Sequence, residues 1–305
     1  MQLAFAILSF AAGALLAVQA GANAQLAKAA GSPLTATVIQ LAFGALLLAL
    51  LAAMSGDLAA LARLGEGPLW HALGGVASAL YVVAAIVLYP RIGAVLAVGL
   101  IITGQMLASL TLDLSGLFGV APRAPGAGML IGAAAILAGA VAIARGAADR
   151  STASLGRAGW FALALVAGAA LPVQGAVNGL LRHDIGAPIA VSVVSFAVAT
   201  IAMLIVVIAV RLRSNVGGAG TGFAAMPWWG WLGALCGATY VTSVFTAIPV
   251  IGASATVGLT VLGQQAASLL VDQYGLLRLP RRAVSTTRMA GVALLMAGVL
   301  AIRLW

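Results

Sequence analysis

Polar side chains inside long apolar runs are the residues of this sequence that could bind a ligand. Each must find a hydrogen-bond partner, because burying an amide without one costs roughly 2–7 kcal/mol. Among the polar residues of these runs we single out six carboxamides and two tyrosines: Gln19, Asn23, Gln105, Gln174, Asn178, Gln264, Tyr81 and Tyr240. Such neutral groups can hold a polar molecule, and we predict that these eight residues bind a substrate. The alternative is that they only join helices by interhelical hydrogen bonds.

Asp113 and Asp272 are the only acidic residues within the apolar runs. An acid at membrane depth suggests a function by default. Both residues stand near the ends of their runs, where we expect them to reach interfacial water. We therefore predict a structural, gating or coupling role for them rather than substrate binding.

The remaining reactive side chains are too few for enzyme or metal chemistry. The two histidines, His71 and His183, are far apart in sequence, and Cys236 is the single cysteine. No GxxxxGK[ST] loop for a nucleotide and no HExxH motif for zinc is present. We expect no metal, no cofactor and no catalytic activity.

Composition places the chain in a membrane. Hydrophobic residues make up 63% of it and charged residues only 7%, whereas soluble proteins carry about 25% charged residues. The net charge of +9 does not indicate nucleic-acid binding, because the 15 Lys and Arg residues form no dense patch and stand mostly in short gaps between apolar runs. That distribution is typical of membrane anchoring, with lipid as the surrounding partner.

A membrane-spanning helix needs about 20 mainly apolar residues. This criterion predicts an all-α protein with ten transmembrane helices, at 3–24, 33–54, 68–90, 93–114, 126–145, 158–180, 187–210, 227–249, 252–273 and 287–304.

The two sets of five predicted helices repeat each other. Residues 12–24 match residues 167–179 at seven of thirteen positions with an offset of 155, and residues 93–117 match residues 252–276 at thirteen of twenty-five with an offset of 159. We predict a first repeat at 1–148, a linker at 149–157 and a second repeat at 158–305. Because five is odd, the second copy must cross the membrane in the opposite direction, which gives an inverted repeat.

The distribution of Lys and Arg predicts the orientation. The loops after the odd-numbered helices, with the adjoining helix ends, hold 11 of these residues, and the opposite side holds 4. Because cytoplasmic loops carry the excess of positive charge, we predict that both termini face away from the cytoplasm.

A short element occurs once in each half and makes the sequence recognisable. It reads VQ…N followed by G-x-P, at Val18, Gln19, Asn23, Gly31 and Pro33 and again at Val173, Gln174, Asn178, Gly186 and Pro188. With the run from Ile251 to Asp272, it resembles the YdcZ-like family of the drug/metabolite transporter superfamily. The resemblance covers nearly the whole chain. It implies a fused two-half protein of the bacterial inner membrane that has the ten-helix fold and central cavity of that superfamily. In such a membrane, the distribution of Lys and Arg predicts that both termini lie in the periplasm.

Small multidrug transporters of this superfamily use a membrane-embedded glutamate in their first helix, and this chain offers Gln19 and Asn23 there instead. We therefore expect a secondary transporter that moves a small neutral or zwitterionic metabolite by alternating access. A flippase for a lipid-linked substrate, which needs a cavity open to lipid, and a non-transporting membrane assembly subunit, which needs a packed interior, are the alternatives. The sequence leaves open whether the chain forms a homodimer.

Overall fold

The computed structural model describes residues 1–92, 94–145, 158–213, 220–279, 281 and 286–304, and these residues form helices and no strand. The α-helices of the first half are α1 (Gln2–Ala30), α2 (Pro33–Ser55), α3 (Gly75–Ile92), α4 (Ala94–Ser115) and α5 (Ala127–Arg145). Those of the second half are α6 (Ala158–Ile185), α7 (Pro188–Arg213), α8 (Leu232–Ile251), α9 (Ala253–Tyr274) and α10 (Thr286–Leu304). The predicted linker 149–157 lies outside the described residues.

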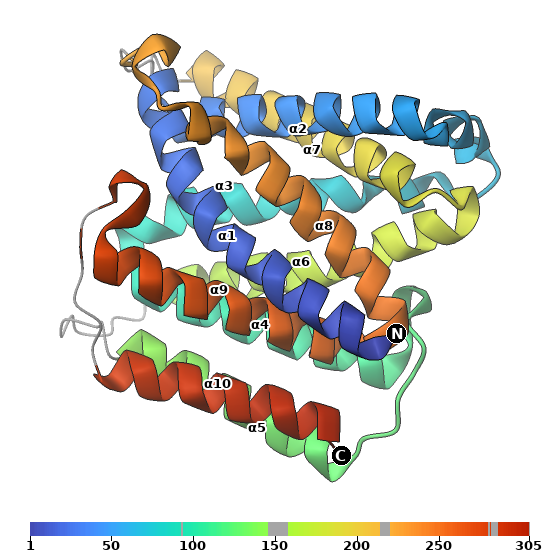
Figure 1. Cartoon of the computed structure of the whole chain (residues 1–305), viewed down its shortest axis with the longest axis vertical. Helices are drawn as coiled ribbons and strands as arrows, with labels where there is room; N and C mark the ends of the chain where they lie inside the picture. Colours follow the sequence, from blue (N-terminus) through green and yellow to red (C-terminus); the bar gives the residue numbers. More distant parts are fainter. Residues whose placement is uncertain (93, 146–157, 214–219, 280, 282–285, 305) are drawn as a thin grey trace.

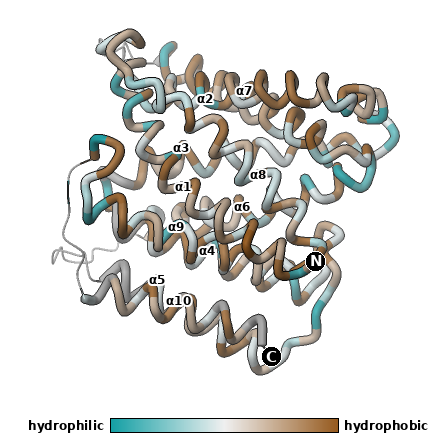
Figure 2. Tube along the Cα trace, in the orientation of Figure 1, coloured by the Kyte–Doolittle hydropathy of each residue, from teal (hydrophilic) through white to brown (hydrophobic). Residues whose placement is uncertain are grey.

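The helices are long and apolar enough for an integral membrane protein, which confirms the class predicted from composition. Eight helical segments of the described chain meet the length and hydropathy of a membrane span, and α5 and α10 contain shorter apolar stretches at Ala127–Gly139 and Met289–Gly298. Figure 2 shows the apolar residues along the helices and the hydrophilic ones mainly at their ends.

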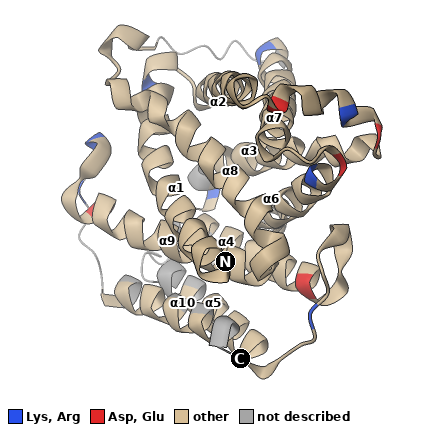
Figure 3. Ribbon diagram, turned by 45° about the vertical axis from the view of Figure 1, so that its right-hand side comes forward, with Lys and Arg blue, Asp and Glu red and all other residues tan. Residues whose placement is uncertain are grey.

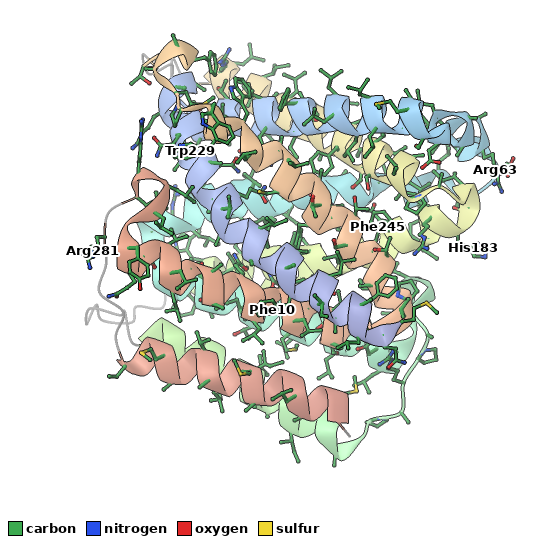
Figure 4. The ribbon with its side chains drawn as sticks, viewed as in Figure 1. Phe10, Arg63, His183, Trp229, Phe245 and Arg281 are labelled. Atoms are coloured by element: carbon green, nitrogen blue, oxygen red, sulfur yellow. The ribbon has the colours of Figure 1, made fainter. Side chains whose placement is uncertain are left out.

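The helices form one layered bundle in which corresponding pairs make corresponding contacts (Figure 1). Helix α1 packs on α8 and α9, whereas α6 packs on α3 and α4. Helix α2 packs on α7, and α5 packs on α10. Both chain termini lie at the same end of the bundle, here called the termini end (Figure 1). Arg63 and His183 also lie there, whereas Trp229 and Arg281 lie toward the other end (Figure 4).

Glycines bring α1 and α9 into backbone contact. A Cβ atom on Gly13 would collide with the carbonyl oxygen of Thr260, and a Cβ atom on Gly263 would collide with that of Phe10. Only a residue without a side chain allows two helix backbones to come this close. The interface therefore requires glycine at both positions.

The contact between α4 and α6 is built in the same way at corresponding positions. A Cβ atom on Gly168 would collide with the carbonyl oxygen of Ile101, and one on Gly104 with that of Leu165. Gly168 and Leu165 follow Gly13 and Phe10 by 155 residues, while Ile101 and Gly104 precede Thr260 and Gly263 by 159. The two sequence offsets thus relate the two interfaces residue by residue.

The turn before α2 shows how local chemistry starts a helix. Gly31 ends α1 in the left-handed conformation, with φ of 70°. Ser32 then caps α2 by accepting a hydrogen bond from the Thr35 backbone amide at 3.4 Å, and Pro33 takes the first helical position. The G-x-P element at Gly186 and Pro188 occupies the corresponding turn, and Gly186 has φ of 77°.

The glycine contacts predict a position-specific effect of alanine. Gly168→Ala should destabilise the protein by roughly 1–3 kcal/mol, because the added methyl group forces α4 and α6 apart. Gly179→Ala in the same helix is the matched control, since no atom lies within 4 Å of its added Cβ. That control should be neutral or slightly stabilising, because alanine favours a helix by about 1 kcal/mol over glycine. Thermal unfolding of the purified proteins in detergent measures both, and equal midpoints would contradict the close contact.

Candidate functional site

A cavity of about 220 Å³ lies in the interior between helices of both halves. Seven helices line it, namely α1, α2, α3, α6, α7, α8 and α9. Its polar lining consists of amide and hydroxyl side chains: Gln19, Asn23, Thr37, Gln40, Ser78, Tyr81, Gln174, Tyr240 and Gln264. No Asp, Glu, Lys, Arg or His is among its lining residues, and the described charged residues gather mostly at helix ends and in connections (Figure 3). The cavity is therefore neutral and rich in hydrogen-bonding groups.

Six of the eight residues predicted to bind substrate line this cavity, namely Gln19, Asn23, Tyr81, Gln174, Tyr240 and Gln264. The other two, Gln105 and Asn178, are buried outside its lining. Gln105 corresponds to Gln264 across the repeat offset of 159. The structure thus brings polar residues of both halves together around the cavity, but of the corresponding residues Gln105 and Gln264 only Gln264 lines it.

The amides of α1 pair with α2 and leave two oxygen atoms unbonded. Asn23 donates a hydrogen bond from Nδ2 to Gln40 Oε1 at 2.8 Å. Gln40 in turn donates from Nε2 to the Gly233 carbonyl oxygen at 3.3 Å. Among the described residues, the buried atoms Gln19 Oε1 and Asn23 Oδ1 have no hydrogen-bond partner. Two acceptors on residues of this side of the cavity therefore lack a donor.

The corresponding amides of α6 are more fully bonded. Ser78 donates from its hydroxyl to Gln174 Oε1 at 2.9 Å. Gln174 donates from Nε2 to the Ser195 hydroxyl oxygen at 3.4 Å, and Asn178 donates from Nδ2 to the same oxygen at 3.0 Å. These bonds join α3, α6 and α7 around Gln174 and Asn178, whose Oδ1 still lacks a partner.

Two differences between the halves account for this asymmetry. The position that corresponds to Ser78 is Gly237, 159 residues later, so Gln19 faces a residue without a hydroxyl group. A Cβ atom on Gly237 would stand 3.1 Å from Gln19 Nε2. Likewise Gln40 corresponds to Ser195 with the offset of 155. Gln19 thus faces no side-chain donor at the place where Gln174 has one.

The two tyrosines stand in different environments. Tyr240 on α8 is buried at 9% exposure, and its hydroxyl group interacts with the Thr260 side chain of α9. Tyr81 on α3 is half-buried and also lines the cavity. Aromatic rings with a polar end suit a site that binds a molecule with both apolar and polar parts.

Asp113 lies away from the cavity, and its environment differs from the expectation of interfacial water. It is 1% exposed and accepts hydrogen bonds from the backbone amides of Ala253 and Ser254, each at 2.7 Å. Its carboxylate therefore caps the start of α9, where backbone amides would otherwise lack acceptors. Asp272 is half-buried near the end of α9. A gating or coupling role for either acid stays a prediction.

Sequence reasoning missed Gln40, Thr37, Ser78 and Ser195. Gln40 could have been found, because it is the only carboxamide in the predicted span 33–54. The serines gave no such signal, because a hydroxyl group can bond to its own helix and is ordinary in an apolar run. Only the packing of α3 and α7 on α6 shows that Ser78 and Ser195 bond to Gln174.

Comparison with known proteins agrees with the fold and with the repeat. The sequence model of the family described as "Putative inner membrane exporter, YdcZ" matches residues 4–142 and again residues 159–301. A search of curated proteins finds no match. A solved structure described only as "Crystal structure of protein" is similar, with a TM-score of 0.70 and 18% sequence identity over 99% of this chain and 96% of that one. At that identity it supports the fold alone.

The cap on α9 predicts that Asp113→Ala lowers stability. The substitution leaves two buried backbone amides without an acceptor, and each costs about 1–3 kcal/mol. Thermal unfolding should therefore shift down by several degrees. Ser115→Ala, an exposed position on the last turn of the same helix, should change little. A melting temperature of Asp113→Ala equal to that of the control would contradict the capping role.

Proposed function

The chain belongs to the YdcZ family of inner membrane exporters, and we propose that it is a secondary transporter for a small polar molecule that is neutral or zwitterionic. The cavity with its uncharged polar lining carries this proposal. A ligand with a net charge would lose its hydration there without any opposite charge to compensate it, at a large cost in free energy. A molecule with hydroxyl or amide groups would exchange bonds to water for bonds to the lining.

The unbonded acceptors on α1 favour a substrate that donates hydrogen bonds. Gln19 Oε1 is buried, has no partner among the described residues and belongs to a residue that lines the cavity. A buried acceptor without a donor costs about 1–3 kcal/mol. A bound hydroxyl or N–H group would remove that cost, so the site would discriminate against an analogue that lacks the donor.

We further propose that the helices form two inverted five-helix repeats and that all ten span the membrane. The corresponding glycine contacts of α1 with α9 and of α6 with α4 support the repeat. Helix α1 starts at the termini end, and α6 ends there beside His183 (Figures 1 and 4), which fits opposite directions. The excess of Lys and Arg in the loops that follow the odd-numbered helices supports a periplasmic location for both termini.

The unequal lining of the cavity supports alternating access. The cavity reaches α2 through Thr37 and Gln40, and Gln264 of α9 lines it, whereas the corresponding Gln105 of α4 does not. We propose that in a second conformation the cavity closes toward α2 and opens toward α7. A non-transporting assembly subunit would have no use for such a cavity.

A thermal-shift screen of uncharged and zwitterionic polar metabolites tests the substrate class. A compound that binds the cavity should raise the melting temperature of the purified protein, because it stabilises only the folded state. Amines and carboxylates with a net charge serve as the matched set. Stabilisation by charged compounds alone would contradict the proposal.

Transport of the compound found in that screen, measured in proteoliposomes, tests whether the residues that line the cavity bind it. Gln19→Ala and Gln264→Ala should each lower flux about tenfold or more, since a lost hydrogen bond in a buried site costs about 1–3 kcal/mol. Gln25→Ala is the matched control, because Gln25 is a buried carboxamide on the same helix as Gln19 that does not line the cavity. Unchanged flux in Gln19→Ala and Gln264→Ala, with normal folding, would rule out this site.

A further inference from the structure

A histidine and an aspartate meet at the termini end of the bundle, outside the cavity lining. His71 belongs to the short helix η2 (Leu69–Gly74), which leads into α3, and Asp184 belongs to the last turn of α6. His71 Nδ1 lies 2.5 Å from Asp184 Oδ2. The His71 side chain is 10% exposed and that of Asp184 is 16% exposed. The pair therefore joins the two halves of the chain through a largely buried polar contact.

Aromatic and apolar groups surround this pair. The Trp70 ring stands edge-on to His71 with centroids 4.2 Å apart, and it also contacts Phe118 at 6.1 Å. Beneath the pair lies a buried apolar cluster of α6, α7 and α8 that includes Leu181, Ile185, Ala190, Val191 and Phe245. Since this cluster fills the bundle at the termini end, the contact above it helps to hold that end closed.

The other half of the chain has no corresponding pair. The position 159 residues after His71 is Gly230, and the position 155 residues before Asp184 is Ala29. Neither can form a hydrogen bond through a side chain. The close helix contacts are the same in both halves, whereas the His–Asp contact exists at one end only. Because the His71–Asp184 contact exists only at the termini end, a change in pH affects the two ends of the bundle differently.

The charged neighbours of the pair are few. His183 on α6 is 3.9 Å from Asp184 Oδ1, but its own side chain is 90% exposed. Arg63 on η1 (Asp57–Gly65) donates to the Ile185 carbonyl oxygen and pairs with Glu66 at 3.1 Å. Asp57 on η1 and Arg182 on α6 are partly exposed. The parts of α3, α7, α8 and η3 (Leu117–Gly119) described at this end carry no titratable or charged side chain, whereas Asp113 at the end of α4 accepts hydrogen bonds from the backbone amides of α9 and Arg123 lies against Gly252.

We propose that His71 and Asp184 form a pH-sensitive latch, which holds the termini end of the transporter closed more firmly when His71 is protonated. The latch rests on the proposed alternating access, because closing one end leaves the cavity to open at the other. A neutral imidazole can donate Nδ1–H to the carboxylate, and a protonated one forms an ion pair through the same atoms. The bond to the ionised carboxylate is charge-assisted in both states, and protonation of His71 adds the attraction between opposite charges. Protonation of His71 therefore favours closure of the termini end.

A single-cysteine reporter tests the latch without any substrate. Cys236→Ala removes the only native thiol, and Val191→Cys places a new one in the apolar cluster, at a position that is 0% exposed. A membrane-impermeant maleimide reaches this thiol only when the termini end opens. Labelling rates are compared between variants at the same pH. The pH dependence of the reaction between the thiol and the maleimide then cancels in the ratio of the two rates.

In this reporter, His71→Gln keeps a donor for Asp184 but cannot gain a proton. At pH 8 it should label within about twofold of the parent, and at pH 5.5 it should label about threefold to tenfold faster. His183→Gln is the matched control, because it removes the exposed neighbouring histidine, and it should follow the parent at both pH values.

Asp184→Asn provides a second variant if His71→Gln fails to fold. It should likewise label faster than the parent at pH 5.5, because a protonated His71 then faces no carboxylate. A ratio of variant to parent that is the same at both pH values would overturn the latch, and so would a pH effect that disappears in His183→Gln. Since no transported compound is used, a failed flux assay leaves this result intact, and a failed labelling result leaves the cavity assignment intact.

Discussion

A carboxamide at membrane depth must find a hydrogen-bond partner inside the protein, and the interior of this bundle is organised by that requirement. Gln174 of α6 meets it through Ser78 and Ser195. The corresponding Gln19 of α1 does not meet it for its Oε1 atom, because Gly237 stands where a serine would be needed. Gln19 Oε1 has no hydrogen-bond partner among the described residues. This free acceptor makes the neutral cavity a candidate binding site rather than a packed interface between helices.

Close backbone contacts hold this polar interior in place. Glycines bring α1 onto α9 and α6 onto α4 so closely that a single methyl group does not fit. Asp113 adds a cap on the start of α9 from the end of α4. These contacts fix four helices around the amides, and the unequal side chains of the two halves then decide where the space lies.

Much of this could be predicted from the sequence. The apolar runs predicted the helices, and the matched Gln, Asn and Gly positions predicted which elements correspond. The limits had physical causes: a repeat cannot show that Gln264 lines the cavity while Gln105 does not, because both positions hold the same side chain and differ only in their packing. The burial of Asp113 depends on where the start of α9 packs, and the contact of His71 with Asp184 depends on two segments 113 residues apart.

The most direct test of the central claim is an experimental structure of the protein in a lipid nanodisc with a transported compound bound. The account predicts the compound between α1, α3, α8 and α9, with a donor group bonded to Gln19 Oε1 and no charged side chain in contact. A compound bound elsewhere, with Gln19 and Gln264 paired to other side chains in a closed interior, would contradict it.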